Sequence, residues 1–361
     1  MMIDCHTFNN FFKGKRVLIT GHTGFKGSWL CLLLNYFGAK IYGYSLMPPT
    51  EPNMYEAARV DEIVESFIFD IRDREKVLKV FKSVKPEIVF HMAAQPLVLE
   101  SYQYPVETYE TNVMGTINLL EAVRVIGGVK SCIIITTDKC YDNKEWLWGY
   151  RENEPLGGYD PYSSSKSCCE IAVSSYRNSF FNPDYYNSHK TVLSTVRAGN
   201  VIGGGDWARD RLIPDFLRAI SKGDILCIRN PKAIRPWQHV LEPLSGYIRL
   251  AYLSYLEGVK HSTSYNFGPN DDDTRTVEWI AEYMCKLWGK GAQYKVAGNS
   301  NAHEATYLKL DCSKAKFMLG WKPNWNIDKA IRKVIEWYSS WLQNEDIFSV
   351  TIKQIEEYFN S

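Results

Sequence analysis

The sequence feature that most constrains the fold is an alternation, over the first half of the chain, of short apolar runs with longer amphipathic stretches. The apolar runs are residues 16–20, 40–46, 64–71, 86–94 and 131–137, and the first amphipathic stretch is residues 25–38. Short apolar runs are typical of strands buried on both faces of a parallel sheet, and the connections between parallel strands are usually helices. The pattern therefore predicts an α/β fold with a doubly wound parallel sheet.

The regular alternation weakens after Asn200. Residues 201–214 are rich in glycine and charge, and residues 228–243 are rich in proline. The tail, residues 328–342 and 349–359, has the periodicity of two amphipathic helices. We therefore expect two domains. Residues 1–199 with 236–267 would carry the parallel sheet, and 200–235 with 268–361 would form a smaller, mixed α/β domain that holds a substrate.

Composition excludes several classes of protein. The 361 residues carry a net charge of +1 and their basic residues are not clustered, so we expect no nucleic-acid partner. No apolar run approaches the roughly 20 residues that span a bilayer, and the N-terminus lacks the apolar core of a signal peptide. Nine cysteines occur without a CxxC pair, which favours a reducing, cytoplasmic location. No His/Cys spacing suggests a metal site.

A glycine-rich segment, GHTGFKG, follows the first predicted strand and opens the first predicted helix. Gly21, Gly24 and Gly27 would allow a tight turn, close approach of the backbone to a pyrophosphate, and close packing of the helix on the strand. The free N–H groups of the helix N-terminus would bind the anion. This context predicts a Rossmann-type dinucleotide site. The alternative is a glycine-rich turn that binds nothing.

The predicted cofactor is NAD. The carboxylate that binds the adenosine ribose is expected about 20 residues after the glycines. The second strand offers Ser45 there, without a carboxylate and without an Arg or Lys for a 2′-phosphate. Asp70, at the end of the third strand, is a candidate contact for the adenine. Alternatively, Asp70 caps the helix predicted over residues 74–81.

A tyrosine and a lysine, Tyr162 and Lys166, are spaced to lie on one face of a helix. A phenol has an unperturbed pKa of about 10 and needs a neighbouring cation to act as a base near neutral pH. Thr137, at the end of the fifth predicted strand, would supply a hydroxyl for the reacting oxygen of the substrate. The alternative is an ordinary exposed turn of helix.

These motifs together resemble a known family. GHTGFKG, TTDKCY and YSSSK are similar to the extended short-chain dehydrogenase/reductase family, also called the NAD-dependent epimerase/dehydratase family. The longer segments PPTEPN, WGYRENEPLGGYDPYSSSK, RAGNVIGGGDWARDRLIPD and RNPKAIRPWQHVLEPLSGY resemble the nucleotide-sugar 4,6-dehydratases within it. The resemblance extends from about residue 12 to about residue 321.

The resemblance implies a site and a reaction. The implied substrate is CDP-glucose, which loses water to give a 4-keto-6-deoxy sugar for deoxysugar biosynthesis of the O-antigen or lipopolysaccharide type. The implied catalytic residues are Thr137, Asp138, Lys139, Tyr162 and Lys166. The implied NAD-binding residues are Gly21, Thr23, Gly24, Phe25, Gly27, Ser45, Asp70, Ile71, Ala93, Ala94 and Asn112, with Tyr162 and Lys166.

One position departs from the family pattern. Asp138 stands where the family has the acid that protonates the departing 6-hydroxyl, but Lys139 replaces the glutamate that would remove the C5 proton. Lys139 could itself be the base, or it could polarise the 4-keto oxygen while another group takes the proton. The alternative for this acid–amine pair is a surface ion pair.

The substrate side is also assigned by resemblance. The implied contacts are Asn200, Arg211, Leu212, Arg235, Trp237 and Glu304. Arginine suits a diphosphate because its planar guanidinium binds two oxygens at once. The resemblance also implies a homodimer or homotetramer, in which helices over residues 114–126 and 165–181 pair as a four-helix bundle.

Two other classes of function stay open at this stage. A sugar-nucleotide 4-epimerase, or a dehydratase for another nucleotide hexose, would also need Tyr162 and Lys166, but an epimerase has no use for an acid at C6. A catalytically silent NAD-binding scaffold or redox sensor could keep the glycines. It would have no reason to keep Thr137 and Asp138 beside that pair.

Overall fold

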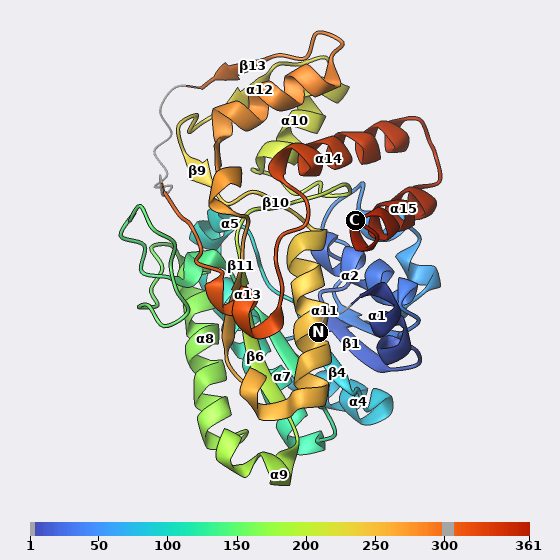
Figure 1. Cartoon of the computed structure of the whole chain (residues 1–361), viewed down its shortest axis with the longest axis vertical. Helices are drawn as coiled ribbons and strands as arrows, with labels where there is room; N and C mark the ends of the chain where they lie inside the picture. The colour runs from blue at the N-terminus through green and yellow to red at the C-terminus, as the bar shows by residue number, and fades with distance from the viewer. Residues whose placement is uncertain (1–3, 298–306) are drawn as a thin grey trace.

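A seven-stranded parallel sheet forms the centre of the molecule (Figure 1). The computed structural model describes residues 4–297 and 307–361. The strand order is β11–β6–β5–β4–β1–β2–β3, which is the doubly wound order of a Rossmann sheet with one strand added. The strands are β1 Arg16–Thr20, β2 Lys40–Ser45, β3 Glu65–Ile68, β4 Ile88–His91, β5 Ser131–Ile135, β6 Val192–Ala198 and β11 Ser264–Phe267.

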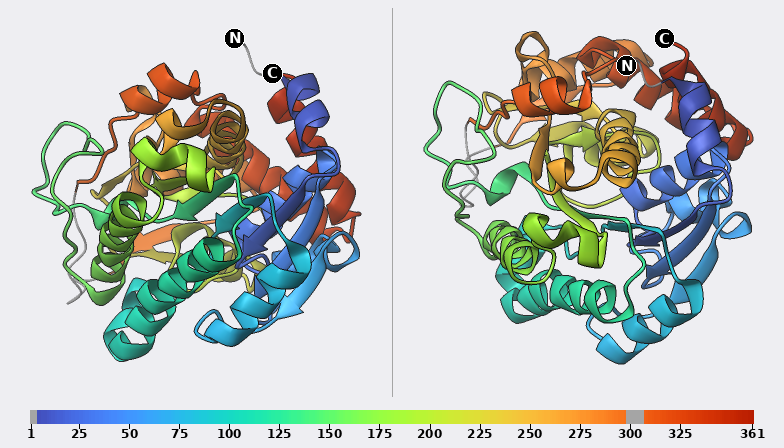
Figure 2. Two further views of the ribbon diagram at one scale, coloured as in Figure 1. Left: turned by 90° about the horizontal axis from the view of Figure 1, so that it is seen from below. Right: turned by 60° about the horizontal axis from the view of Figure 1, so that its bottom comes forward.

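Helices cover both faces of this sheet (Figure 2). Along β1, the side chains of Val17 and Ile19 join one apolar core, while Leu18 joins the other. The alternation follows from the strand geometry, in which successive side chains point to opposite faces. The first core is closed by α1 Cys5–Phe12, α2 Phe25–Tyr36 and α11 Leu241–Glu257, and the second by α4 Arg74–Val84, α7 Gly115–Ile126 and α8 Pro161–Ser179.

Shorter elements connect these layers. They are α3 Met54–Ala57, α5 Val98–Gln103, α6 Pro105–Tyr109, α9 Tyr186–His189, β7 Val201–Ile202, β10 Gln238–His239 and the turns η1 Val60–Glu62, η2 Glu110–Met114, η3 Asp138–Cys140, η4 Pro183–Tyr185, η5 Gly258–His261 and η6 Asp271–Asp273. Strands β10 and β7 pair in parallel next to the sheet.

A second group of elements lies beyond the carboxyl ends of the strands, at the top of Figure 1. It contains two small sheets, an antiparallel pair β9–β12 and a parallel pair β8–β13, so its architecture is mixed α/β. Its elements are α10 Leu212–Ser221, β8 Leu226–Ile228, β9 Ile234–Arg235, β12 Arg275–Thr276, α12 Val277–Trp288, β13 Tyr294–Val296 and α14 Ile327–Leu342. Two further helices pack lower down: α13 Ser313–Leu319 lies against α11 and β11, and α15 Ile347–Phe359 lies against α2 and α14.

The glycine run Gly203–Gly205 lies where the two groups of elements meet. A Cβ on Gly204 would lie 2.0 Å from Cγ of Trp337 in α14, and a Cβ on Gly203 would lie 3.0 Å from the ring of Phe25. The indole of Trp29 in α2 donates a hydrogen bond of 2.8 Å to the Gly204 carbonyl. The run is therefore a packing joint, which only glycine fits.

The predicted parallel α/β sheet and the two tail helices are confirmed by these elements. All nine cysteines are free thiols. Across residues 4–297 and 307–361, no helix combines the length and apolar character needed to cross a membrane. The exact division into two domains stays a prediction.

Candidate active site

The glycine loop between β1 and α2 has the shape that a dinucleotide phosphate requires. Gly21 has a φ of +74°, and a Cβ there would lie 2.8 Å from the backbone nitrogen of Ala93. A Cβ on Gly27 would lie 2.1 Å from the Gly21 carbonyl oxygen. Gly24 is the N-cap of α2, and Phe25 is its first residue. The loop therefore leaves the backbone open in front of a helix N-terminus, and it fits a bound pyrophosphate.

The residues predicted for the adenosine half follow β2 and β3. The Thr23 hydroxyl donates to the Leu46 carbonyl at 2.9 Å and lies 2.9 Å from the Ser45 hydroxyl. Asp70 forms an ion pair with Arg72 at 2.7 Å, and this pair lowers the pKa of the Asp70 carboxyl. The alternative role of Asp70 as a helix cap is wrong, because the N-cap of α4 is Asp73.

Four further predicted NAD contacts are placed by the core of the sheet. Ile71 is buried against Gly115, whose Cβ would lie 2.7 Å from Ile71 Cγ2. Ala93 and Ala94 follow β4, and the Ala93 N–H donates to the Thr20 hydroxyl at 3.1 Å. Asn112 is buried in η2, and its amide donates to the Ser165 hydroxyl of α8 at 2.8 Å.

The sequence TTDK lies where β5 reaches the surface. The strand ends at Ile135, and Asp138 begins a tight turn capped by the Thr137 side chain. The turn releases Asp138 and Lys139 from the strand alternation that would point them to opposite faces. The Thr137 hydroxyl donates to Asp138 Oδ1 at 3.0 Å, and Lys139 Nζ lies 3.9 Å from the same oxygen.

Asp138 and Lys139 differ sharply in environment. The Asp138 side chain is 1% exposed, and its buried Oδ2 atom has no hydrogen-bond partner among residues 4–297 and 307–361. The Lys139 side chain is 37% exposed. Asp138 is therefore not part of an ordinary surface ion pair, because a buried carboxylate oxygen without a donor is costly unless a ligand supplies one.

Tyr162 and Lys166 lie one turn apart near the start of α8, as the spacing predicted. Burial raises the pKa of the Tyr162 phenol to about 12, although Thr137 and Arg211 act in the opposite direction. Lys166 Nζ donates to the Ile135 carbonyl at 3.2 Å, and burial lowers the pKa of its ammonium. The phenol, the ammonium and the Thr137 hydroxyl thus meet at the end of β5.

The predicted substrate residues divide into two groups. Arg211 forms an ion pair with Asp206 at 3.0 Å and lies close enough to Tyr162 to lower the pKa of that phenol. Leu212 begins α10. Asn200 Oδ1 and Trp237 Nε1 are buried and have no hydrogen-bond partner in the part of the chain that the structure describes.

The remaining substrate residues are less directly tied to the catalytic group. Arg235 lies in β9, paired with Arg275 of β12. Glu304 lies outside the described residues.

Ser45 and Asp70, which are predicted to bind NAD, lie apart from the catalytic group, because their strands are three and four positions from β5 in the sheet. This separation matches the length of a dinucleotide that has its reactive end at β5.

Lys26 is an active-site residue that the sequence reasoning missed. Its Nζ donates to the Tyr247 hydroxyl at 3.2 Å and lies 5.3 Å from the centre of that ring. Burial first, and then the charges of Arg211 and Lys166, lower the pKa of Lys26 to about 7. A charged residue inside the apolar start of α2 was the available signal.

The sheet order, the glycine loop and the Tyr162–Lys166 pair together define a Rossmann-fold protein of the short-chain dehydrogenase/reductase type. A family model described as GDP-mannose 4,6 dehydratase matches residues 18–334. The chain belongs to this family, the extended epimerase/dehydratase branch of the short-chain dehydrogenases/reductases.

Individual relatives agree with this assignment. The CDP-glucose 4,6-dehydratase of Salmonella typhimurium is 55% identical over 352 residues, which cover 98% of each chain. Among solved structures, the dTDP-glucose 4,6-dehydratase of Streptomyces venezuelae, with NAD and TYD bound, has a TM-score of 0.77 at 22% identity and covers 92% of this chain and 99% of its own. The UDP-glucose 4-epimerase of Thermotoga maritima has a TM-score of 0.76 at 22% identity, with coverages of 90% and 99%.

Proposed function

We propose that this chain is a hydro-lyase that converts CDP-D-glucose to CDP-4-keto-6-deoxy-D-glucose and water. C4 is oxidised and C6 is reduced in the same turnover, so the reaction needs no external oxidant. The product enters deoxysugar biosynthesis of the O-antigen or lipopolysaccharide type. The relative that is 55% identical over 98% of both chains supports the substrate.

The proposed cofactor is NAD, which when bound accepts hydride from C4 of the sugar and returns it to C6. The glycine loop and the residues that follow β2, β3 and β4 would hold it. Tyr162 takes the proton of the 4-hydroxyl, and the Thr137 hydroxyl holds the reacting oxygen. The Thr137 hydroxyl and the positive charge of Arg211 favour the phenolate, which opposes the raised pKa caused by burial. Lys166, one helical turn after Tyr162, would add the positive charge of its ammonium.

The elimination step needs a second acid and a base. The 4-keto group acidifies the C5 proton, and Asp138 protonates the 6-hydroxyl as it leaves with its bonding electrons. Lys139 is 37% exposed and 3.9 Å from Asp138, so its amine can reach the sugar as the C5 base or as a cation at the 4-keto oxygen. Arg211, Arg235 and the Asn200 amide would bind the diphosphate, and Leu212 and Trp237 would line the nucleotide site.

The burial of Asp138 beside Thr137 favours a dehydratase over an epimerase. An epimerase exchanges hydride at C4 alone and has no step that needs a proton donor at C6. The buried, unpartnered Oδ2 atom of Asp138 is instead available to a substrate hydroxyl. A silent scaffold would have no reason to bury an unpaired carboxylate oxygen.

The test is incubation of the purified protein with NAD and, separately, CDP-, dTDP-, UDP- and GDP-linked sugars. Formation of a 4-keto-6-deoxy product from CDP-glucose alone, with no net reduction of NAD, is the expected result. Interconversion of glucose and galactose without loss of water would identify an epimerase. Binding of NAD without any turnover would identify a scaffold.

We propose further that the chain assembles as a homodimer or homotetramer through a four-helix bundle. Helices α7 and α8 lie side by side at one edge of the molecule (Figure 2). Large apolar side chains are exposed on these helices and next to them, as expected for a face that a second copy covers. They are Val106 (64% exposed), Met114 (49%), Val125 (54%), Ile171 (58%) and Phe180 (47%).

The division of labour follows the sequence prediction. We propose that residues 1–199 with 236–267 bind NAD and that 200–235 with 268–361 bind the nucleotide sugar. We also propose a cytoplasmic location, which the nine free thiols and the nucleotide-sugar substrate support.

A further inference from the structure

Two oppositely charged side chains are buried behind the catalytic residues. Arg197 in β6 donates from Nε and Nη2 to the two carboxylate oxygens of Glu170 in α8, each at 2.9 Å. The side chains are 3% and 2% exposed. This two-point geometry is the strongest form of an Arg–carboxylate contact.

The pair is joined to the strands on both sides of it. The Thr136 hydroxyl donates to Glu170 at 2.5 Å, and the Thr195 hydroxyl donates to it at 2.7 Å. Arg197 Nη1 donates to the Tyr141 hydroxyl at 2.8 Å, directly after the turn that carries Asp138. The network therefore connects the end of β5, the turn after it, β6 and α8.

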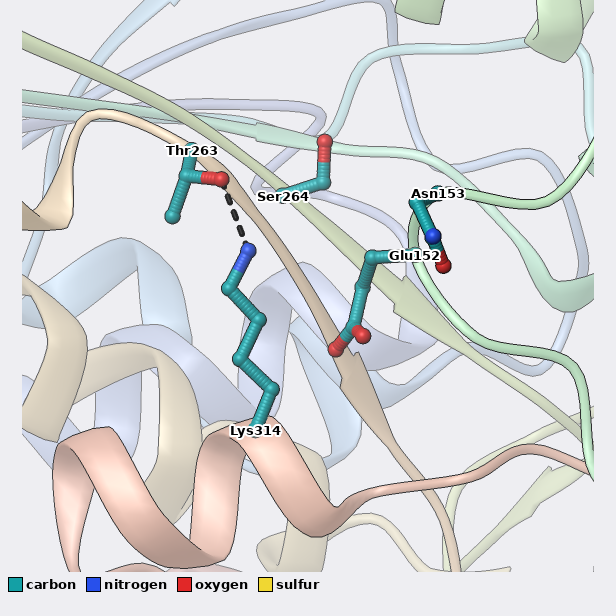
Figure 3. A pocket seen from close by; sticks show the side chains of 5 residues that line it. All are labelled: Glu152, Asn153, Thr263, Ser264 and Lys314. Atoms are coloured by element: carbon teal, nitrogen blue, oxygen red, sulfur yellow. Dashed lines mark hydrogen bonds between the residues drawn. The ribbon is translucent and has the colours of Figure 1, made fainter.

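The Glu170–Arg197 pair lies next to the proposed catalytic residues in both the strand and the helix. Thr136 precedes Thr137, and Glu170 lies one helical turn after Lys166. The Ser264 hydroxyl also donates to Glu170, at 3.4 Å. Figure 3 shows Ser264 with Glu152 and Lys314 around a pocket of about 260 Å³. The pair is thus in contact with a residue that lines this polar pocket, as well as with Thr136 beside the catalytic threonine.

We propose that Glu170 and Arg197 are positioning residues of the active site, which fix the strand end carrying Thr137 and Asp138 against the helix carrying Lys166 and place a negative charge behind that lysine. The inference rests on the proposed function, because it takes Tyr162 and Lys166 as the acid–base pair. Neither residue of the pair touches the reacting atoms.

Stability alone is a weak reason for such a pair. Removing two charges from water is costly, and replacing a buried ion pair by apolar side chains is often neutral or stabilising. A charge-dependent role explains the arrangement better. Burial lowers the pKa of Lys166, whereas the Glu170 carboxylate raises it. Although burial opposes it, Arg197 keeps the pKa of Glu170 below its ordinary value, so that the carboxylate stays charged.

The other groups that face these two side chains come from several elements. Around Lys166 they are the Ile135 carbonyl, Cys140, Cys169, His91 and Lys26; around Glu170 they are Arg197, Arg177, Cys140, Thr136, Thr195 and Ser264. Among the described residues that raise the pKa of Lys166, Glu170 is the only carboxylate, and the other two are thiols. Removal of its charge should therefore act on Lys166 directly.

The experiment compares Glu170→Gln and the double variant Glu170→Gln/Arg197→Met with the wild type. Both variants lack the carboxylate, and the double variant leaves no unpaired charge, so it stays testable if the single variant does not fold. In both variants, the alkaline limb of the pH profile of kcat for CDP-glucose should lie about one pH unit lower than in the wild type. Arg197→Lys keeps both charges and should keep the wild-type alkaline limb.

A second readout does not depend on turnover. The titration of Lys166, followed by NMR with isotope-labelled lysine and assigned with Lys166→Met, should shift down by the same amount. Glu242→Gln is the matched control. Glu242 is also a buried carboxylate, which accepts bonds from Trp325 and Tyr358, but it lies on α11. Loss of the Glu242 carboxylate should lower the stability of the protein without shifting the alkaline limb of the pH profile of kcat.

Each outcome is decisive. If the double variant folds and both its alkaline limb and its Lys166 titration coincide with the wild type, the pair is only structural and the inference is wrong. If Glu242→Gln moves the limb equally, the shift reports general loosening, and the inference is also wrong. If the wild type does not dehydrate CDP-glucose but the Lys166 titration still shifts, the proposed function fails while the electrostatic role of Glu170 stands.

Discussion

Replacement of Asp138 by asparagine separates the two chemical steps of the proposed reaction. The Asp138 side chain is 1% exposed, and Oδ1 accepts a 3.0 Å bond from Thr137. An asparagine oxygen can keep that bond, and the amide group takes the place of Oδ2, which has no donor to lose. The variant should therefore fold with a stability cost of about 1 kcal/mol.

The chemical cost is larger, because an amide cannot donate a proton to a departing hydroxyl. Loss of a positioned general acid typically lowers a rate by about 10²–10⁴. That factor corresponds to about 2.7–5.4 kcal/mol of transition-state stabilisation. In the proposed mechanism, oxidation at C4 uses Thr137, Tyr162 and Lys166, so this first step should survive in Asp138→Asn.

The assay follows the sugar by mass spectrometry and NMR after a single turnover. The 4-keto sugar that still carries its 6-hydroxyl should accumulate in Asp138→Asn, while the wild type releases water. Asp142→Asn is the matched control, since Asp142 pairs with Lys144 at the surface and is 45% exposed. Dehydration by Asp138→Asn within about tenfold of the wild type would refute the acid assignment. Loss of the first oxidation would show instead that Asp138 serves binding.

Four further outcomes are expected. Tyr162→Phe should lower turnover by about 10²–10⁴ while NAD still binds, and a near-normal rate would identify another base. Lys139→Met should stop exchange of solvent deuterium into C5 if Lys139 is the base, whereas continued exchange would leave it the role of polarising the ketone. The pKa of Lys26 is lowered to about 7, so above pH 7 the folded protein has lost a proton that the unfolded chain keeps. The free energy of unfolding should therefore rise between about pH 7 and about pH 9 by at most about 2.7 kcal/mol relative to Lys26→Met. Parallel pH curves of the two proteins in chemical denaturation would contradict this. Ile171→Asp places a charge on the 58% exposed apolar position of α8 and should shift light scattering to a monomer, which would not change if the bundle lies elsewhere.

Much of this fold could be predicted from the sequence because its signals are local. The run RVLIT forms β1 with its predicted bounds. Gly21 and Gly27 after it pack so closely on Ala93 and on the Gly21 carbonyl, respectively, that only glycine fits at either position. Tyr162 and Lys166 share a helix, so four residues of spacing sufficed to pair them.

The features that the sequence did not reveal depend on contacts between distant residues. Lys26 belongs to the candidate active site because the fold brings its amine close to Arg211 and Lys166, which are distant from it in the sequence. Asp70 and Asp73 are both plausible caps by pattern, and only the backbone geometry assigns the role to Asp73. The Glu170–Arg197 pair joins α8 to β6, and no short motif links two such positions.

The packing joint at Gly203–Gly205 has a consequence for how the enzyme moves. The joint is held by Trp29 of the sheet region on one side and by Trp337 of the tail on the other. A rotation that opened the two regions like a hinge would break the indole hydrogen bond and separate a close-packed contact. Large-scale closure is therefore costly, and substrate entry is left to the loops at the rim. In hydrogen exchange, the Trp29 indole N–H that makes this bond should exchange as slowly as the amides of the central strands, as expected of a rigid seam rather than a flexible link.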